Sequence, residues 1–227
     1  MTRHPTLDVE TAITGRRSIR RFLPEPVPRE VIEGILAVAA RAPSGANMQP
    51  WRVHVVTGEA KRRVGAAVTA AAARGERAPD YDYYPDEWFE PYRSRRRQIG
   101  FALYDLLGIA RDDKAAREAQ SRRNFLFFDA PVGLFVTVDR RLELGSWLDA
   151  AMFLQTLLLA ARGRGLEACA QASWVAHAGT VRATLGIDGD EVLLSGVALG
   201  HRDPDAPENT LRTERAPPAA FTTWHGE

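Results

Sequence analysis

The chain has 227 residues, and its 30 basic residues are offset by 29 acidic ones, so the formal net charge at pH 7 is +1. This balance produces no field that would attract nucleic acid or a membrane surface, and neither is expected as a partner. A chain of this length can bury a sizeable core as one domain. The single cysteine, Cys169, cannot form an intrachain disulfide and lies in an apolar run, which favours a buried thiol in a reducing compartment.

The segments that could act as targeting or membrane elements lack the required patterns. Residues 1–10 mix His, Pro and acidic side chains without an apolar centre, which does not match a signal peptide. The longest apolar run, 150–161, is interrupted by Gln155 and Thr156 and is too short to span a bilayer. We therefore expect a cytoplasmic protein.

Hydrophobic periodicity predicts helices interleaved with four or five strands, and so an α+β fold in one domain over 1–227. The expected helices cover 7–13, 28–40, 59–73, 99–109, 115–125, 144–162 and 179–185, and the expected strands cover 52–57, 131–138, 166–172 and 191–198. The helix over 144–162 has few polar residues and should be buried nearly all round. An inserted lid or arm is expected at about 75–98 and a C-terminal tail at about 200–227. The absence of a G-x-G-x-x-G after the first strand argues against a dinucleotide-binding doubly wound fold.

Four arginines and a serine are concentrated in residues 16–22, directly after a Thr14-Gly15 break that should end the preceding helix. Guanidinium groups match phosphate with two parallel hydrogen bonds and keep their charge, and a hydroxyl adds a neutral donor. The segment therefore suits a phosphomonoester on a small cofactor. A solvated basic turn is the alternative interpretation of any short arginine run.

The segment 43–51 lies between a helical run and a strand without fitting either period. Gly45 allows close approach of a flat ligand, while Ser44, Asn47 and Gln49 supply donors and acceptors for a ring edge that alternates carbonyls and nitrogens. An ordinary turn of Pro, Ser, Gly and Asn is the alternative.

The inserted segment 81–97 interleaves aromatic side chains with acids and arginines. Its acidic residues would repel the phosphates of a nucleic acid, so stacking on bases is discounted. Rigid flat side chains instead suit a wall over an aromatic substrate or a dimer arm, and a loop that merely packs on the core remains an equal alternative. The candidate substrate-binding residues are Tyr84, Trp88 and Tyr92.

Together these segments resemble the nitroreductase family of flavin mononucleotide (FMN) oxidoreductases. The family pattern R-R-S-x-R, then A-P-S-x-x-N-x-Q-P-W before a strand, is matched by residues 16–20 and 42–51. Residues 196–200, Asn209 and 212–217 are similar to the family's closing strand, glycine turn and phosphate-reaching tail. The resemblance implies a nitroreductase-like fold with a central mixed, mainly antiparallel sheet flanked by helices, and a homodimer with flavins at its interface.

The resemblance also implies roles for individual residues. Arg16 is expected near the pyrimidine edge of the flavin ring, with Arg17, Ser18 and Arg20 toward the ribityl phosphate. Arg215 should close the phosphate site, with Arg212 as a possible second arginine. The loop residues Pro43, Ser44, Gly45, Asn47 and Gln49 are expected to line the ring from the opposite subunit. Ala172, Ser173 and Trp174 occupy the place where the family directs backbone amides to the ring, although Trp174 also suits the core.

No catalytic side chain can be named, because a flavin performs hydride and electron transfer itself. His54 lies among valines of a strand and is expected to be a satisfied structural histidine, and no metal site is expected. The predicted function is NAD(P)H-dependent reduction of nitroaromatic compounds by a ping-pong cycle, closest to the nitrobenzoate type. Arginines between positions 93 and 97 could pair a substrate carboxylate, although exposure is expected for most of them. Quinones, enones or halogenated aromatics as substrates remain open, as does a non-catalytic flavin-binding protein.

Overall fold

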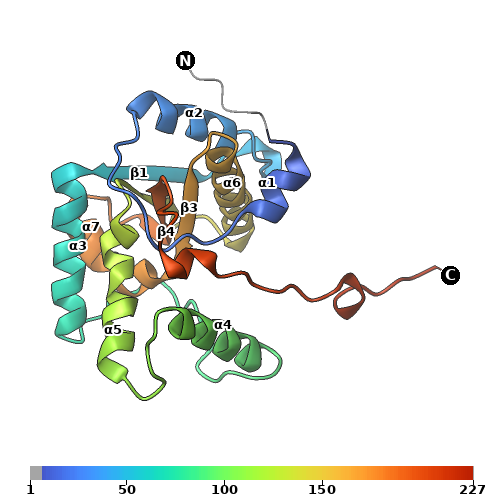
Figure 1. The fold of residues 1–227 in the computed structure, drawn as a ribbon. Helices are drawn as coiled ribbons and strands as arrows, with labels where there is room; N and C mark the ends of the chain where they lie inside the picture. The colour runs from blue at the N-terminus through green and yellow to red at the C-terminus, as the bar shows by residue number, and fades with distance from the viewer. Residues whose placement is uncertain (1–6, 227) are drawn as a thin grey trace.

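The computed structural model describes residues 7–226 (Figure 1). Residues 1–6 and Glu227 of the expected domain lie outside the described part of the chain. The helices are α1 (Val9–Gly15), α2 (Arg29–Ala39), α3 (Gly58–Ala73), α4 (Tyr92–Leu106), α5 (Lys114–Arg122), α6 (Leu144–Arg162) and α7 (Ala178–Leu185). The strands are β1 (Trp51–Thr57), β2 (Val132–Asp139), β3 (Glu167–Gln171) and β4 (Glu191–Gly200).

The strands form one sheet in the order β1-β2-β4-β3, with each neighbouring pair antiparallel. The predicted α+β class with a mainly antiparallel sheet flanked by helices is confirmed, and residues 7–226 contain no parallel pair of strands. β2 and β4 are central and almost completely buried, which is why they read as continuous apolar runs. β3 lies at one edge of the sheet, so within residues 7–226 it pairs with a strand on one side only.

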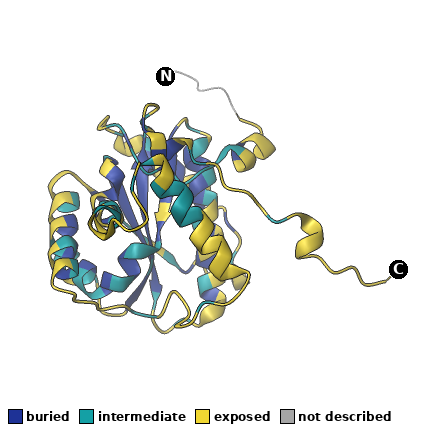
Figure 2. Ribbon diagram, turned by 60° about the horizontal axis from the view of Figure 1, so that its bottom comes forward, coloured by how far each residue is buried: buried dark blue, intermediate teal, exposed yellow. Residues whose placement is uncertain are grey.

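The sheet is covered on both faces. Phe135 of β2 packs into a cluster with α3 and α7, whereas its neighbours Leu134 and Val136 pack into a second cluster with α2 and α6. This division follows from the alternation of side chains along a strand. Figure 2 shows the result: the strands are buried at the centre of the molecule, while α4 and the C-terminal tail are largely exposed.

Helix α6 has the predicted bounds but is not buried all round. Leu144, Leu148 and Met152 are 70%, 69% and 40% exposed and form one apolar stripe at helical spacing, because no element within residues 7–226 covers that face. By length and composition α6 could cross a membrane, but its opposite face packs into the core, and the core helix of a soluble protein passes the same test. The stripe is therefore an uncovered apolar surface of this chain.

Two boundaries differ from the prediction. α4 begins at Tyr92, within the segment expected to be an irregular insertion, because the arginine-rich stretch after Pro91 consists of good helix formers. α5 ends at Arg122, and a 3₁₀ segment, Arg123–Asp129, follows in which Phe127 and Phe128 have positive φ angles. Both phenylalanines are buried in the core, so tertiary packing overrides the local helical pattern there.

The segment before α4 and the end of the chain stand apart from the core. Residues 75–91 run mainly over the surface as irregular chain. The tail leaves the body beyond residue 211 and extends past α4 (Figure 1). Its side chains Phe221 and Trp224 are 72% and 86% exposed, so they make little contact with their own chain.

Candidate functional site

The arginine-rich segment 16–22 is extended and is held by a residue distant in sequence. Asn209 is buried beyond β4, and its Oδ1 accepts a hydrogen bond from Arg20 N at 2.8 Å. Asn209 Nδ2 donates to Arg21 O at 2.8 Å, and Arg17 Nη1 donates to Asn209 O at 2.9 Å. The backbone of the segment is therefore positioned before any ligand binds.

One side of this segment faces β3. Burial raises the pKa of the Cys169 thiol, and the nearby Arg20, Ser18 and Arg16 oppose that rise. Successive residues of an extended chain point to opposite sides, so Arg16, Ser18 and Arg20 share the side that approaches β3. The expectation of a buried thiol at Cys169 is confirmed.

The other side carries Arg17. Burial lowers the pKa of the Arg17 guanidinium, and the positive charges of Arg212 and Arg202 lower it further. These three arginines line a small pocket of about 240 Å³, whereas Arg20 lines a much larger cavity. Alternation along the chain therefore separates Arg17 from Arg16, Ser18 and Arg20, and of these four residues Arg20 lines the larger cavity. Their contacts with a cofactor remain predictions.

The cavity that Arg20 lines has a volume of about 570 Å³ and lies at the end of β3; we call it the large cavity to distinguish it from the small pocket of Arg17. The predicted residues Ala172 and Ser173 line it, together with Arg20 and Tyr84. Gln171 Nε2 donates to Asn124 O at 2.9 Å and so ties the strand end to the 3₁₀ segment after α5. The other lining residues include Tyr81, Tyr83, Leu103, Tyr104, Gln120, Ser121, Phe128, Trp147, Leu154 and Ser195.

The donors in this cavity fit the groups of FMN. Gln120 Nε2 is buried without a hydrogen-bond partner among the described residues, and Gln120 lines the cavity. Such a donor is rare in a native structure unless a ligand or water satisfies it. Arg20 adds a fixed cation, Ser173 a hydroxyl, and the apolar lining suits the faces of a flat ring. The residues present therefore fit a planar cofactor with polar edges.

Trp174 does not line the cavity with its side chain. The indole is completely buried, its ring lies 4.5 Å from that of Phe127 and 5.0 Å from that of Phe135, and Nε1 donates to Gln171 Oε1 at 3.3 Å. The side chain is part of the aromatic core, and a contact of the Trp174 backbone with the cofactor remains a prediction. The alternative of a core tryptophan is the observed one.

The loop 43–49 lies away from the cavity of its own chain. It is attached to α6 by a hydrogen bond from Gly45 N to Asp149 Oδ2 at 3.1 Å, and it is largely exposed. Three of its residues, Ala46, Asn47 and Gln49, have φ angles of 49°, 56° and 50°, which L-residues rarely adopt. Such backbone strain is concentrated at ligand sites and switch regions. Among the described residues that line the cavity, none comes from this loop.

The predicted tail arginines also lie outside the cavity. Arg212 shares the small pocket with Arg17 and also borders a groove between the tail and α4. Arg215 lines that groove, and its Nη1 donates to the carbonyl oxygen of Glu214 at 2.9 Å. The structure therefore does not bring Arg215 to the cavity within this chain.

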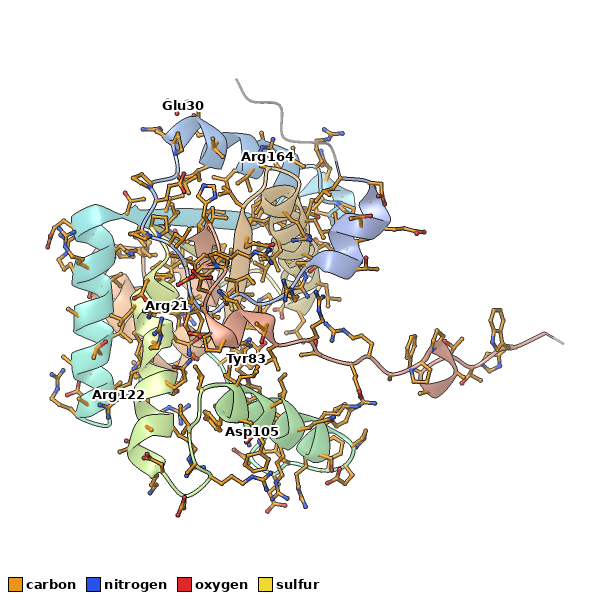
Figure 3. All side chains as sticks on the ribbon, in the orientation of Figure 1. Arg21, Glu30, Tyr83, Asp105, Arg122 and Arg164 are labelled. Carbon is orange, nitrogen blue, oxygen red and sulfur yellow. The ribbon has the colours of Figure 1, made fainter. Side chains whose placement is uncertain are left out.

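The aromatic insertion forms one wall of the cavity. Tyr84 lines it directly, while Trp88 packs against Tyr84 with ring centroids 5.2 Å apart. Tyr92 is turned toward Phe89 at 5.1 Å and does not line the cavity, so its expected direct substrate contact is not supported in this chain. Figure 3 shows Tyr83 between the sheet and α4.

Tyr81 and Gln120 are cavity residues that sequence reasoning did not single out. Burial raises the pKa of Tyr81 well above its ordinary value, and its OH donates to Leu194 O at 3.0 Å. Its ring packs edge-on against Trp147 at 4.8 Å. The aromatic insertion in the sequence predicted a wall of the cavity, but it did not indicate which tyrosine would hold that wall in place. The sequence pattern of α5 did not indicate Gln120.

The remaining expectations concern histidine and metals. His54 Nε2 lies 2.8 Å from Glu191 Oε2, which confirms a satisfied structural histidine. Within residues 7–226, no group of His, Cys, Asp or Glu is arranged to hold a metal ion.

The sequence profile described as the nitroreductase family matches residues 13–201. The chain is 40% identical over 218 residues to a nitrobenzene nitroreductase of Ectopseudomonas oleovorans, covering 95% of this chain and 96% of that protein. It is 39% identical over 221 residues to a 4-nitrobenzoate reductase of Pseudomonas putida, covering 97% of each. The crystal structure of the FMN- and NADPH-dependent nitroreductase NfnB from sphigopyxis sp. strain HMH matches with a TM-score of 0.95 and 43% identity, covering 97% of this chain and 100% of that one. The expected resemblance is confirmed, and the chain belongs to the nitroreductase family.

Proposed function

We propose that this protein is an FMN-dependent NAD(P)H oxidoreductase that reduces nitroaromatic compounds in a ping-pong cycle. The observation that carries the proposal is the cavity at the end of β3, which is lined by both polar and apolar residues, among them Arg20 and a Gln120 amide without a partner among residues 7–226. Support comes from relatives of about 40% identity over nearly the whole chain that are named as nitroaromatic reductases. The same family and fold underlie the assignment of FMN as the resident cofactor and NAD(P)H as the transient donor.

The residues of this chain would bind FMN and hold it in a fixed orientation. Arg16 and Ser18 share the side of the segment that faces β3 and are assigned to the phosphate. Arg20 places a permanent positive charge in the cavity, which favours any negative charge that gathers there. The backbone of Ala172 and Ser173 is assigned to the ring edge. FMN, when bound, supplies the hydride and electron transfer, so no side chain is needed as a nucleophile.

A second subunit is part of the proposal. The loop residues Pro43, Ser44, Gly45, Asn47 and Gln49 do not line the cavity of their own chain, so we assign them to the cavity of a second copy. The exposed stripe on α6, to which Asp149 attaches this loop, supplies an apolar surface for such a homodimer. Arg212 and Arg215, which lie on the tail, remain predictions as phosphate contacts. We infer one domain over 1–227 in a soluble, cytoplasmic protein without nucleic-acid or membrane partners.

Absorption spectroscopy of the purified protein tests the proposal. A visible flavin spectrum should bleach on anaerobic addition of NADPH or NADH and recover when a nitroaromatic compound is added. Arg20→Ala should fold but retain little FMN, because it removes the cation that lines the cavity. A protein that cannot be loaded with FMN would overturn the cofactor assignment. A bound flavin that neither donor reduces would instead show a non-catalytic flavin-binding protein.

A further inference from the structure

A second pocket adjoins the large cavity. It has a volume of about 400 Å³ and lies between α4 and α5. Arg20, Leu103 and Tyr104 line both spaces, so the two are neighbours that share a wall. A ligand whose ring occupies the large cavity can therefore place a substituent at the entrance of the smaller pocket.

The smaller pocket is strongly cationic. Four of its nine lining residues are arginines, Arg20, Arg96, Arg97 and Arg117, and none is acidic. Within residues 7–226, none of these four has a carboxylate within 4 Å, although eleven other arginines do. Arginines that gather without acidic partners repel one another, and an anion between them relieves that repulsion.

The nearby acidic side chains are engaged elsewhere. Asp113 caps α5 by accepting a hydrogen bond from Ala116 N at 2.9 Å, and Glu118 pairs with Arg122 at 3.6 Å. Neither carboxylate lines the pocket. Arg97 helps to lower the pKa of a third carboxyl, Glu90, which accepts a hydrogen bond from Ser94 N at 3.3 Å and does not line the pocket. Most of the positive charge of the arginines is therefore available to a ligand.

Contacts with the aromatic wall orient one of these arginines. The guanidinium carbon of Arg96 lies 4.9 Å from the ring centroid of Trp88, a cation–π contact. Trp88 in turn packs against Tyr84, which lines the large cavity, and Arg96 lowers the pKa of Tyr84 against the larger effect of burial, which raises it. Arg117 is half-buried and donates from Nε to Asp113 O at 3.4 Å, which leaves its terminal nitrogens free.

We propose that Arg96, Arg97 and Arg117 form an anion subsite, which binds the carboxylate of an aromatic acid whose ring lies in the large cavity. The inference rests on the proposed function and names its substrate class: acidic rather than neutral nitroaromatics. Guanidinium forks match a carboxylate with paired hydrogen bonds, and several partly exposed arginines acting together exceed the small effect of one surface pair. The phosphates of the nicotinamide donor carry the same chemistry and are the second possible source of the anion.

The test uses the FMN-loaded protein and three variants, of which the two double variants have equal net charge. R96Q/R97Q removes two arginines of the subsite, and R117Q removes the third in a separate variant. The matched control, R95Q/R122Q, removes two arginines from the same helices, of which Arg95 faces the groove beside the tail and Arg122 lies outside the pocket. Acceptors are 4-nitrobenzoate and its neutral methyl ester, each with NADPH and with NADH. Binding of benzoate, measured by calorimetry, provides a readout that needs no turnover.

The expected result is a rise of about tenfold in the KM for 4-nitrobenzoate and in the Kd for benzoate in R96Q/R97Q, with the ester unchanged. R117Q should show the same selectivity, the control should not, and added salt should reduce the preference for the acid in the unmodified protein. If the variants lose activity with NADPH but not with NADH, the anion subsite is supported, and the anion that it binds is a phosphate of the nicotinamide donor. Changes that are equal for acid and ester and also equal with NADPH and NADH, or no change at all, would overturn it.

The two proposals fail differently. If the unmodified protein reduces neither acceptor, the proposed function is wrong, and benzoate binding still reports on the arginines. If it reduces the ester equally well in every variant but shows no selective loss for the acid, only the subsite is wrong.

Discussion

The two walls of the large cavity are built in opposite ways. The β3 wall is part of the core: Gln171 is 2% exposed and Trp174 is completely buried behind it. The opposite wall is the aromatic insertion, where Tyr84 is 56% and Phe89 59% exposed and the contacts are mostly between neighbouring rings. A change in the β3 wall should therefore cost stability, and a change in the insertion should cost binding.

The largest effect is expected behind the β3 wall. A Cβ on Gly196 would overlap the ring of Trp174, which Phe135 and Phe127 hold from other sides. Gly196→Ala should lower the free energy of unfolding by about 3 kcal/mol, because a close-packed core cannot yield to the extra carbon. Urea unfolding measures this. Gly189→Ala is the control, since its Cβ would meet nothing within 4 Å. Equal midpoints for the two variants would contradict a rigid wall.

A somewhat smaller loss is expected at the anchor of the arginine segment. Asn209→Ala removes the acceptor of Arg20 N and the donor to Arg21 O, so it should cost about 2 kcal/mol and also weaken FMN retention. Chemical denaturation and the flavin-to-protein absorbance ratio report the two effects. Thr210→Ala removes only a local bond to Pro207 O and should change neither. Full FMN retention in Asn209→Ala would show that the segment is held by other contacts.

Stability beside the cavity should depend on pH through Asp80, which directly precedes the cavity residue Tyr81. Asp80 has 3% of its side chain exposed and accepts hydrogen bonds from Leu193 N at 3.0 Å and Arg140 Nη2 at 2.7 Å. Burial alone would raise the pKa of this carboxyl, but these bonds and Arg182 lower it on balance. The unfolded chain therefore binds the proton first, and the stability from Asp80 is present above the ordinary pKa of 3.8 and lost as the pH falls through the folded value.

Asp80→Asn should accordingly cost about 2 kcal/mol at pH 7 and flatten the acid limb of the stability profile. Denaturation at a series of pH values between neutral and strongly acidic measures both. Asp86→Asn, an exposed change in the same insertion, is the control and should leave the profile as it is. An unaltered acid limb in Asp80→Asn would assign the pH dependence to other carboxylates.

The smallest effect on stability is expected in the insertion itself. Trp88→Ala should change the free energy of unfolding by no more than about 0.5 kcal/mol, because Trp88 packs on exposed neighbours. It should raise the KM for the aromatic acceptor about threefold, because Tyr84 loses the ring behind it. Phe89→Ala, which removes the ring packed against Tyr92 and not one packed against Tyr84, serves as control. A large loss of stability in Trp88→Ala would make the insertion part of the core.

Much of the fold, and the family, could be predicted from the sequence, because the patterns that indicate them are local. The period of apolar residues placed all four strands and six of the seven helices to within a few residues, and the bounds of α6 were correct. The order of Arg16 to Arg20 and the residues of the loop 43–49 pointed to the family, which the comparisons confirm. Periodicity depends only on neighbours along the chain, and so do these motifs.

The tertiary structure decided which side chains reach the cavity. Alternation along an extended segment turned Arg20 toward β3 and Arg17 toward Asn209, and only the contact with Asn209 fixes which side is which. Trp174 is part of the core because Phe127 and Phe135, which belong to other elements, pack against it. The gathering of Arg96, Arg97 and Arg117 likewise depends on how α4 packs beside α5. Such contacts join residues far apart in the chain, and their geometry is set by packing that no local pattern encodes.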